Sequence, residues 1–162
     1  MQGMEIRMDK EIYLKFYTKA AAYCSLAEHC EHEVREKMKA WEVPTEMVGD
    51  IINQLKEELF MDDKRYCRAF VADKLKHNKW GCVKIRYELI KKRIKSDVIS
   101  EALSNVDEQE YLNMAQYLMD KKRKEIKAKD TYELRNKLYR FMAGRGFELE
   151  VMEVAYANLM TE

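Results

Sequence analysis

Residues that interrupt helices are scarce in this chain, which has one Pro and five Gly among 162 residues. Hydrophobic residues make up 47% of the sequence and charged residues 36%. This balance is typical of a helical protein rich in Glu, Lys, Leu and Met, and it argues against both a β-sandwich and a disordered chain. We therefore expect an all-α protein that is long enough to bury a core.

Long apolar runs are also missing. No stretch of about 18 apolar residues could span a membrane, and the N-terminus does not have the form of a signal peptide. We therefore expect a soluble, cytoplasmic protein with no membrane partner. The four cysteines form no C-x-x-C pair and lie in helical contexts, which suits reduced thiols. They are Cys24, Cys30, Cys67 and Cys82.

Signatures of catalysis and metal binding are absent as well. The sequence has no Gly-rich phosphate loop and no nucleophile elbow. His32-Glu33 lacks the second His of an H-E-x-x-H zinc motif. Asp62-Asp63 resembles a metal-binding or acid–base pair, but helix capping explains Asp62, and no third ligand has suitable spacing. We therefore expect no catalytic residue, no metal, no cofactor and no enzymatic activity.

One short pattern occurs three times and predicts helix starts. An apolar residue precedes an Asp, and a Tyr follows the Asp by four positions, at residues 8–13, 61–66 and 106–111. The Asp fits a helix N-cap, and the apolar residue and the Tyr fit a hydrophobic staple. We therefore expect helices to start at Asp9, Asp62 and Asp107.

Two further patterns recur with nearly the same period. An apolar residue followed by Arg recurs at Arg35, Arg86 and Arg135, which are 51 and 49 residues apart. This recurrence leaves open a shared structural pairing or a shared ligand contact. Apolar stripes with the spacing i, i+1, i+4, i+5, i+8 begin at Met47, Val98 and Val151. Such spacing forms one side of an α-helix.

Together the patterns predict about nine helices in a tandem array of three three-helix repeats, elongated or curved. We expect the units to cover residues 9–60, 61–106 and 107–160. No linker separates them, so neighbouring units should share apolar surface. The first helix of the third unit is expected to be the longest and to run through residues 121–129. An array with its own end units can be a monomer.

Charge is segregated along the chain although the net charge is only +1. Residues 28–63 hold eleven acids and four bases, a net charge of −7. Residues 64–95 hold twelve bases and two acids, which gives +10, and residues 121–145 carry +7. Such asymmetry is expected of a protein that meets a polyanion or a partner of mixed charge.

The basic residues of the middle unit gather around Trp80-Gly81, where we expect two short helices to meet. We favour a binding role for this cluster over a plain solvated face. Trp80 could stack on a base or contact a partner, or it could pack at the helix junction. The candidate partner-binding residues are Arg65, Arg68, Lys76, Lys79, Trp80, Lys84, Arg86, Lys91, Lys92 and Arg93.

The middle unit reads M-D-D-x-R-Y-x-x-A-F-V at residues 61–71 and K-W-G-x-x-x-I-x-x-E-L at residues 79–89. This motif resembles the central motif of the RecX family, bacterial modulators of the RecA recombinase. The flanking segments 31–38 and 138–147 resemble the first and third repeats of that family. At Lys92-Arg93 this chain departs from it, because the family usually has a Gly at the end of this helix.

The resemblance implies tandem three-helix repeats related to helix-turn-helix units, and a non-enzymatic role. Proteins of this family lie along the groove of RecA filaments on single-stranded DNA. They inhibit ATP hydrolysis, strand exchange and coprotease activity. The implied partner is therefore the RecA filament, and weak direct binding to single-stranded or duplex DNA stays open.

An alternative function is that of a helix-turn-helix regulator acting directly on duplex DNA. Residues 83–93 would then form the recognition helix in the major groove. The low net charge and the lack of a dimer zipper argue against this alternative.

Overall fold

The computed structural model describes residues 2–161, and within that range the regular elements are all helical. The first three helices are α1 (Gln2–Leu26), α2 (Glu31–Ala40) and α3 (Thr45–Glu57). The next are α4 (Asp63–Asp73), the π-helical segment η1 (Lys74–Asn78), α5 (Cys82–Lys91) and α6 (Ser96–Ser104). The last are α7 (Glu108–Glu125), α8 (Thr131–Gly144) and α9 (Leu149–Thr161).

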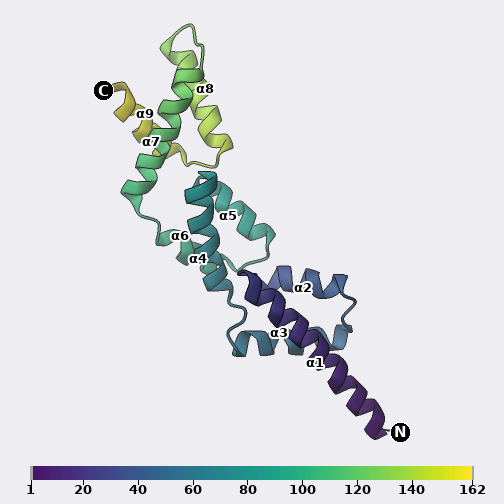
Figure 1. Cartoon of the computed structure of the whole chain (residues 1–162). Helices are drawn as coiled ribbons and strands as arrows, with labels where there is room; N and C mark the ends of the chain where they lie inside the picture. The colour runs from purple at the N-terminus through teal and green to yellow at the C-terminus, as the bar shows by residue number, and fades with distance from the viewer. Residues whose placement is uncertain (1, 162) are drawn as a thin grey trace.

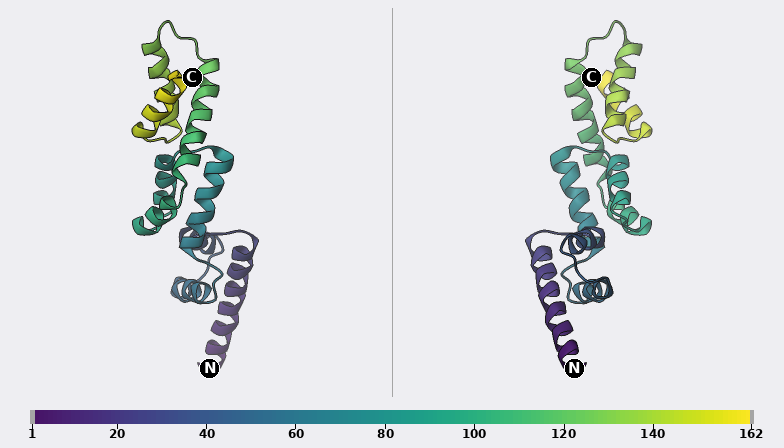
Figure 2. Two further views of the ribbon diagram at one scale, coloured as in Figure 1. Left: turned by 90° about the vertical axis from the view of Figure 1, so that its left-hand side faces the viewer. Right: turned by 90° about the vertical axis from the view of Figure 1, so that its right-hand side faces the viewer.

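The helices group in threes along an elongated array (Figure 1). The N-terminus lies at one end, and α7, α8 and α9 lie at the other; the views in Figure 2 show the same order. This arrangement confirms the predicted fold of three tandem three-helix units. The residue numbers at which we divide the units stay a prediction.

Each unit has its own hydrophobic core, to which the predicted apolar stripes contribute. In the described chain, Ile51, Ile52 and Leu55 of α3 lie in the first core. Ile99 of α6 lies in the middle core, and Met152 of α9 in the third. The stripes therefore face inward, as their helical spacing predicted.

Two of the three predicted N-caps are confirmed. The Asp62 carboxylate accepts hydrogen bonds from the backbone N–H groups of Lys64 and Arg65, at 2.9 and 3.3 Å. Asp107 accepts one from the N–H of Glu110 at 2.8 Å. The prediction for Asp9 was wrong, because α1 begins at Gln2 and Asp9 lies inside it. Residues 4–8 contain no Pro or Gly, so the helix continues through them toward the N-terminus instead of starting at Asp9.

The prediction that the third unit begins with the longest helix was also wrong. Helix α1 has 25 residues and α7 has 18. Helix α7 ends at Glu125, because Ile126 adopts an extended conformation (φ −83°, ψ 132°) and packs its side chain against the third core. Lys127 and Lys129 therefore lie in the connection to α8 rather than in α7.

Two residues after its end, the second helix of each unit is followed by a residue with left-handed backbone conformation. These residues are Glu42, Arg93 and Gly146, with φ of 59°, 57° and 91°. Glycine tolerates this conformation best. The usual Gly of the RecX motif near Lys92-Arg93 thus corresponds to a real backbone requirement, which this chain meets with Arg93.

Candidate partner-binding surface

The middle and third units meet where the α8–α9 turn inserts between η1 and α5. The N–H of Gly81 donates to the carbonyl oxygen of Arg145 at 2.7 Å, and the N–H of Val83 donates to that of Gly146 at 2.9 Å. These carbonyls satisfy the free N–H groups at the start of α5, where Gly81 has no capping side chain. A Cβ on Gly81 would lie 2.2 Å from the Gly146 oxygen, so only glycine fits.

Two side chains reinforce this joint. The Arg145 guanidinium donates to the carbonyl oxygens of Asn78 and Lys79, at the end of η1. The N–H of Cys82 donates to the Tyr111 hydroxyl at 2.8 Å, and that hydroxyl donates to Glu148 at 2.9 Å. Burial, helped by the nearby Cys82 thiol and Glu148 carboxylate, raises the pKa of Tyr111, so its hydroxyl stays a neutral donor.

The joint between the first and middle units uses the start of α2. Cys30, the residue before α2, is buried in the middle core, and burial raises the pKa of its thiol to about 12. Burial alone would raise the pKa of Glu33, but the Cys30 N–H, Lys92 and the Tyr66 hydroxyl together lower it. Across this joint, the Lys92 ammonium lies 3.6 Å from the Glu33 carboxylate.

Asp63 also belongs to this joint. Its carboxylate accepts a hydrogen bond from the N–H of Glu31 at 3.0 Å, at the start of α2. Asp62 and Asp63 therefore each stabilise the start of a different helix. Within residues 2–161, no three His, Cys, Asp or Glu side chains are placed to hold a metal ion.

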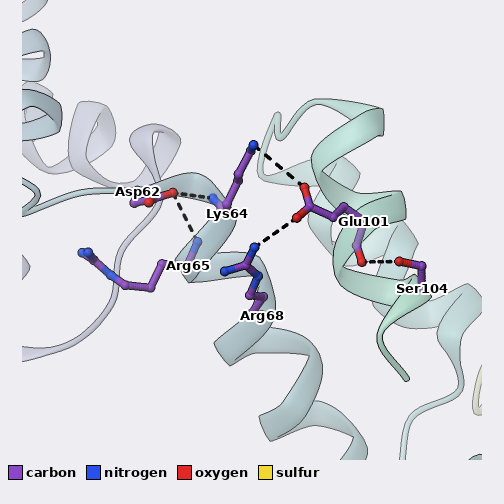
Figure 3. A network of polar contacts seen from close by, with 6 residues as sticks. All are labelled: Asp62, Lys64, Arg65, Arg68, Glu101 and Ser104. Atoms are coloured by element: carbon purple, nitrogen blue, oxygen red, sulfur yellow. Dashed lines mark hydrogen bonds and ion pairs between the residues drawn. The ribbon is translucent and has the colours of Figure 1, made fainter. Parts of the chain in front are cut away.

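Four of the nine predicted basic residues have acidic partners within the chain. Arg65 pairs with Glu28 at 2.6 Å and Arg68 with Glu101 at 3.0 Å, the latter shown in Figure 3. Lys91 pairs with Glu88 at 3.1 Å, and Lys92 with Glu33. Arg65 and Lys92 thus hold the first unit against the middle one, and part of the predicted surface is structural.

The other five have no carboxylate within 4.0 Å among residues 2–161. They are Lys76, Lys79, Lys84, Arg86 and Arg93. Two of them have other partners, since Arg86 bonds to the Ser100 hydroxyl at 3.3 Å and Lys84 lies over the Trp80 ring. Of the nine predicted basic residues, these five are the ones left available to an external anion.

Trp80 is half-buried and packs against the middle core. Its ring lies 5.1 Å from the Lys74 ammonium and 4.6 Å from the Lys84 ammonium. This is the packing role that the sequence left open, and the aromatic ring also holds two cations in place. A direct contact of Trp80 with a partner stays a prediction.

The recurring Arg does not make one shared contact. Arg35 bonds to Glu31 of its own helix, and Arg86 bonds to Ser100. Arg135 lies over the Tyr139 ring at 5.0 Å. The recurrence therefore does not mark a common structural pairing in the described chain.

Two grooves flank the joint between the middle and third units. The first, of about 640 Å³, has Arg68, Lys76 and Lys79 along its α4–η1 wall, and we call it the basic groove. Asp107 and Glu110 lie on its opposite wall.

The second groove has about 660 Å³ and is lined by Glu108, Glu148 and Glu150, and we call it the acidic groove. The sequence did not predict it, because its residues come from α5, α6, α7 and α9 and meet only in the folded array. The two grooves share Val106 and Tyr111.

The fold and its joints define a class of protein: an all-α array of tandem three-helix units related to helix-turn-helix modules. Family models of the second and third three-helix domains of RecX match residues 62–103 and 108–153. The chain belongs to the RecX family. Within residues 2–161 no helix has the length and apolarity needed to cross a membrane.

Similar proteins support the same family. Regulatory protein RecX of Clostridium botulinum (strain Alaska E43 / Type E3) is 38% identical over 125 residues, which are 76% of this chain and 58% of that protein. Its counterpart in Clostridium beijerinckii is 35% identical over 80% of this chain and 61% of its own length. This chain therefore spans about three fifths of these curated relatives.

The same architecture occurs in solved structures. The crystal structure of RecX from Lactobacillus salivarius aligns with a TM-score of 0.88 and 20% sequence identity, over 94% of this chain and 99% of that one. A second crystal structure, of a regulatory protein RecX, aligns with the same TM-score and 21% identity. At this identity the likeness shows the fold.

Proposed function

We propose that this chain is a non-enzymatic regulator that binds RecA filaments on single-stranded DNA and inhibits RecA ATPase, strand exchange and coprotease activity. The observation that carries the proposal is RecX family membership together with the five predicted basic residues of the middle unit that have no carboxylate within 4.0 Å among residues 2–161. The chain would act in the cytoplasm, as a monomer.

The joints support a mechanism based on simultaneous contacts. Hydrogen bonds between backbone groups hold α5 against the α8–α9 turn, and ion pairs hold the first unit against the middle one. An array held in this way can place several weak contacts along a filament at once. Such contacts reinforce one another through effective concentration. A bound array would then obstruct DNA pairing in the filament and favour its disassembly.

The exposed side chains of α5 argue against the alternative that this chain reads duplex DNA directly. The exposed positions of this helix include Val83, Tyr87 and Ile90. A helix that reads base edges presents mainly Arg, Lys, Asn or Gln to the major groove. The outward face of α5 thus suits a protein surface better than a DNA groove.

The test is RecA ATPase on single-stranded DNA, titrated with the wild-type chain and with a triple variant, K76E/K79E/K84E. We expect the wild type to inhibit and the variant to need at least about tenfold more protein, because each reversed charge removes a favourable contact and adds repulsion. A matched triple reversal on the first unit, K10E/K15E/K39E, should inhibit like the wild type.

If the wild-type chain leaves the ATPase unchanged at stoichiometric excess, the proposed function is wrong. If both triple variants lose inhibition equally, the effect reflects total charge and the basic surface has no special role.

A further inference from the structure

The acidic groove lies where four helix ends converge, at the starts of α5, α7 and α9 and the end of α6. Its volume of about 660 Å³ lies within the usual range of binding pockets and is large enough to hold a few side chains of a bound protein segment. The joint of Gly81 and Val83 with the α8–α9 turn fixes two of its walls relative to each other. The groove is therefore preformed.

Apolar side chains line this groove while remaining open to solvent. Val83 of α5 is 53% exposed and Val154 of α9 is 47% exposed. Tyr87 and Ile90 are exposed one and two turns further along α5, on the same side as Val83. The apolar surface thus extends from the groove along α5, as on surfaces that bind other proteins.

The charge of the groove is negative. Three carboxylates, from Glu108, Glu148 and Glu150, line it, against one base, Arg86. Glu148 accepts a hydrogen bond from Tyr111, whereas Glu108 and Glu150 have no hydrogen-bond or ion-pair partner within residues 2–161. Their positions in the first turns of α7 and α9 favour those helices. Stabilising the helix starts explains the two carboxylates, but it does not explain why Val83 and Val154 are exposed beside them.

The exposed valines and the carboxylates together indicate what kind of molecule the acidic groove can bind. A nucleic acid would be repelled by the carboxylates, which lie on a different wall of the joint from the bases of the basic groove. A protein segment with an apolar side chain flanked by Lys or Arg would bury Val83 and Val154 and neutralise Glu108 and Glu150. Complementarity of this kind fixes orientation and excludes wrong partners.

We propose that the acidic groove, with the Val83, Tyr87 and Ile90 face of α5, binds a basic, apolar segment of the RecA protomer. This inference rests on the proposed function. Two grooves of opposite charge at one joint would then contact two different features of the filament. The basic groove would face acidic or phosphate groups, and the acidic groove would hold the protein segment.

The first test compares inhibition of RecA ATPase by the wild type, E108K/E150K and V83S/V154S. We expect both variants to raise the concentration for half-inhibition at least about tenfold. The matched control E46K/E57K changes the same charge on α3 of the first unit and should inhibit like the wild type. If the wild type inhibits and both groove variants inhibit equally well, the groove proposal is wrong while the proposed function stands. If the wild type does not inhibit, the proposed function has failed first.

A second test uses photo-cross-linking and leaves the charge of the acidic groove unchanged. Benzoylphenylalanine placed at Val154 should cross-link to RecA filaments, within a RecA peptide that contains Lys or Arg. The same label at Tyr132, exposed on α8, should give far less of that product. A cross-link from position 154 to DNA, to another copy of this chain, or to an acidic RecA peptide would overturn the proposal, as would the absence of any cross-link.

Discussion

At the scale of single residues, the tightest constraint is the contact between Gly81 and Gly146. A Cβ on Gly146 would lie 2.3 Å from the Lys84 Cβ and 2.6 Å from the Lys84 backbone nitrogen. The backbones of two units therefore touch directly. Such contact leaves no room for any side chain at either position.

This contact predicts a clear stability difference between glycines. Gly81→Ala and Gly146→Ala should each lower the free energy of unfolding by at least about 2 kcal/mol, because backbone atoms must move apart and Gly146 also has a positive φ. Gly49→Ala is the matched control, since its Cβ meets nothing within 4 Å and it lies inside α3. It should raise stability by about 0.5–1 kcal/mol.

Urea unfolding followed by circular dichroism would measure all three variants. Equal effects of Gly81→Ala and Gly49→Ala would contradict the joint as described.

The sequence predicted only one of the two roles of Gly81. A Gly after Trp80 predicted a break between two helices, and α4 with η1 does end there. That the α8–α9 turn, more than sixty positions later, supplies the missing hydrogen-bond acceptors for α5 was not predictable. Local patterns describe one segment at a time, whereas this contact depends on how two units dock.

At the scale of helices, the side-chain caps separate real helix starts from coincidental ones. Asp62 and Asp107 each accept backbone hydrogen bonds at a helix start, and Asp9 lies inside α1. Asp62→Ala and Asp107→Ala should therefore each cost about 1 kcal/mol of stability. Asp9→Ala should change stability by less than about 0.5 kcal/mol, as for ordinary surface substitutions.

Thermal unfolding of the three variants tests this distinction. A loss for Asp9→Ala equal to that for Asp62→Ala would show that Asp9 begins an independent helix after all.

Helix starts were more predictable than helix ends for a physical reason. A cap at Asp62 leaves a local signal of a few residues, which sequence alone reveals. The end of α7 depends instead on Ile126 packing into the third core, and α1 extends past Asp9 toward the N-terminus because residues 4–8 contain no Pro or Gly. Neither leaves a short pattern, so both were misplaced.

At the scale of the whole molecule, periodicity and charge predicted the array and its basic middle unit. They did not distinguish Arg65 and Lys92, which hold the first unit in place, from Lys76 and Lys79, which have no acidic partner in the described chain. Nor did they reveal the acidic groove. Both distinctions depend on side chains from different units meeting at a joint.

We propose that the target of this chain is a RecA filament rather than DNA itself. The most direct measurement is co-sedimentation of the labelled chain at physiological salt with RecA filaments on single-stranded DNA, with the same DNA alone, and with duplex DNA. We expect the chain to bind filaments at least about tenfold more tightly than either DNA alone, and we expect the weak binding to DNA to fall steeply as the salt concentration rises. Equal or tighter binding to DNA without RecA would contradict the proposal.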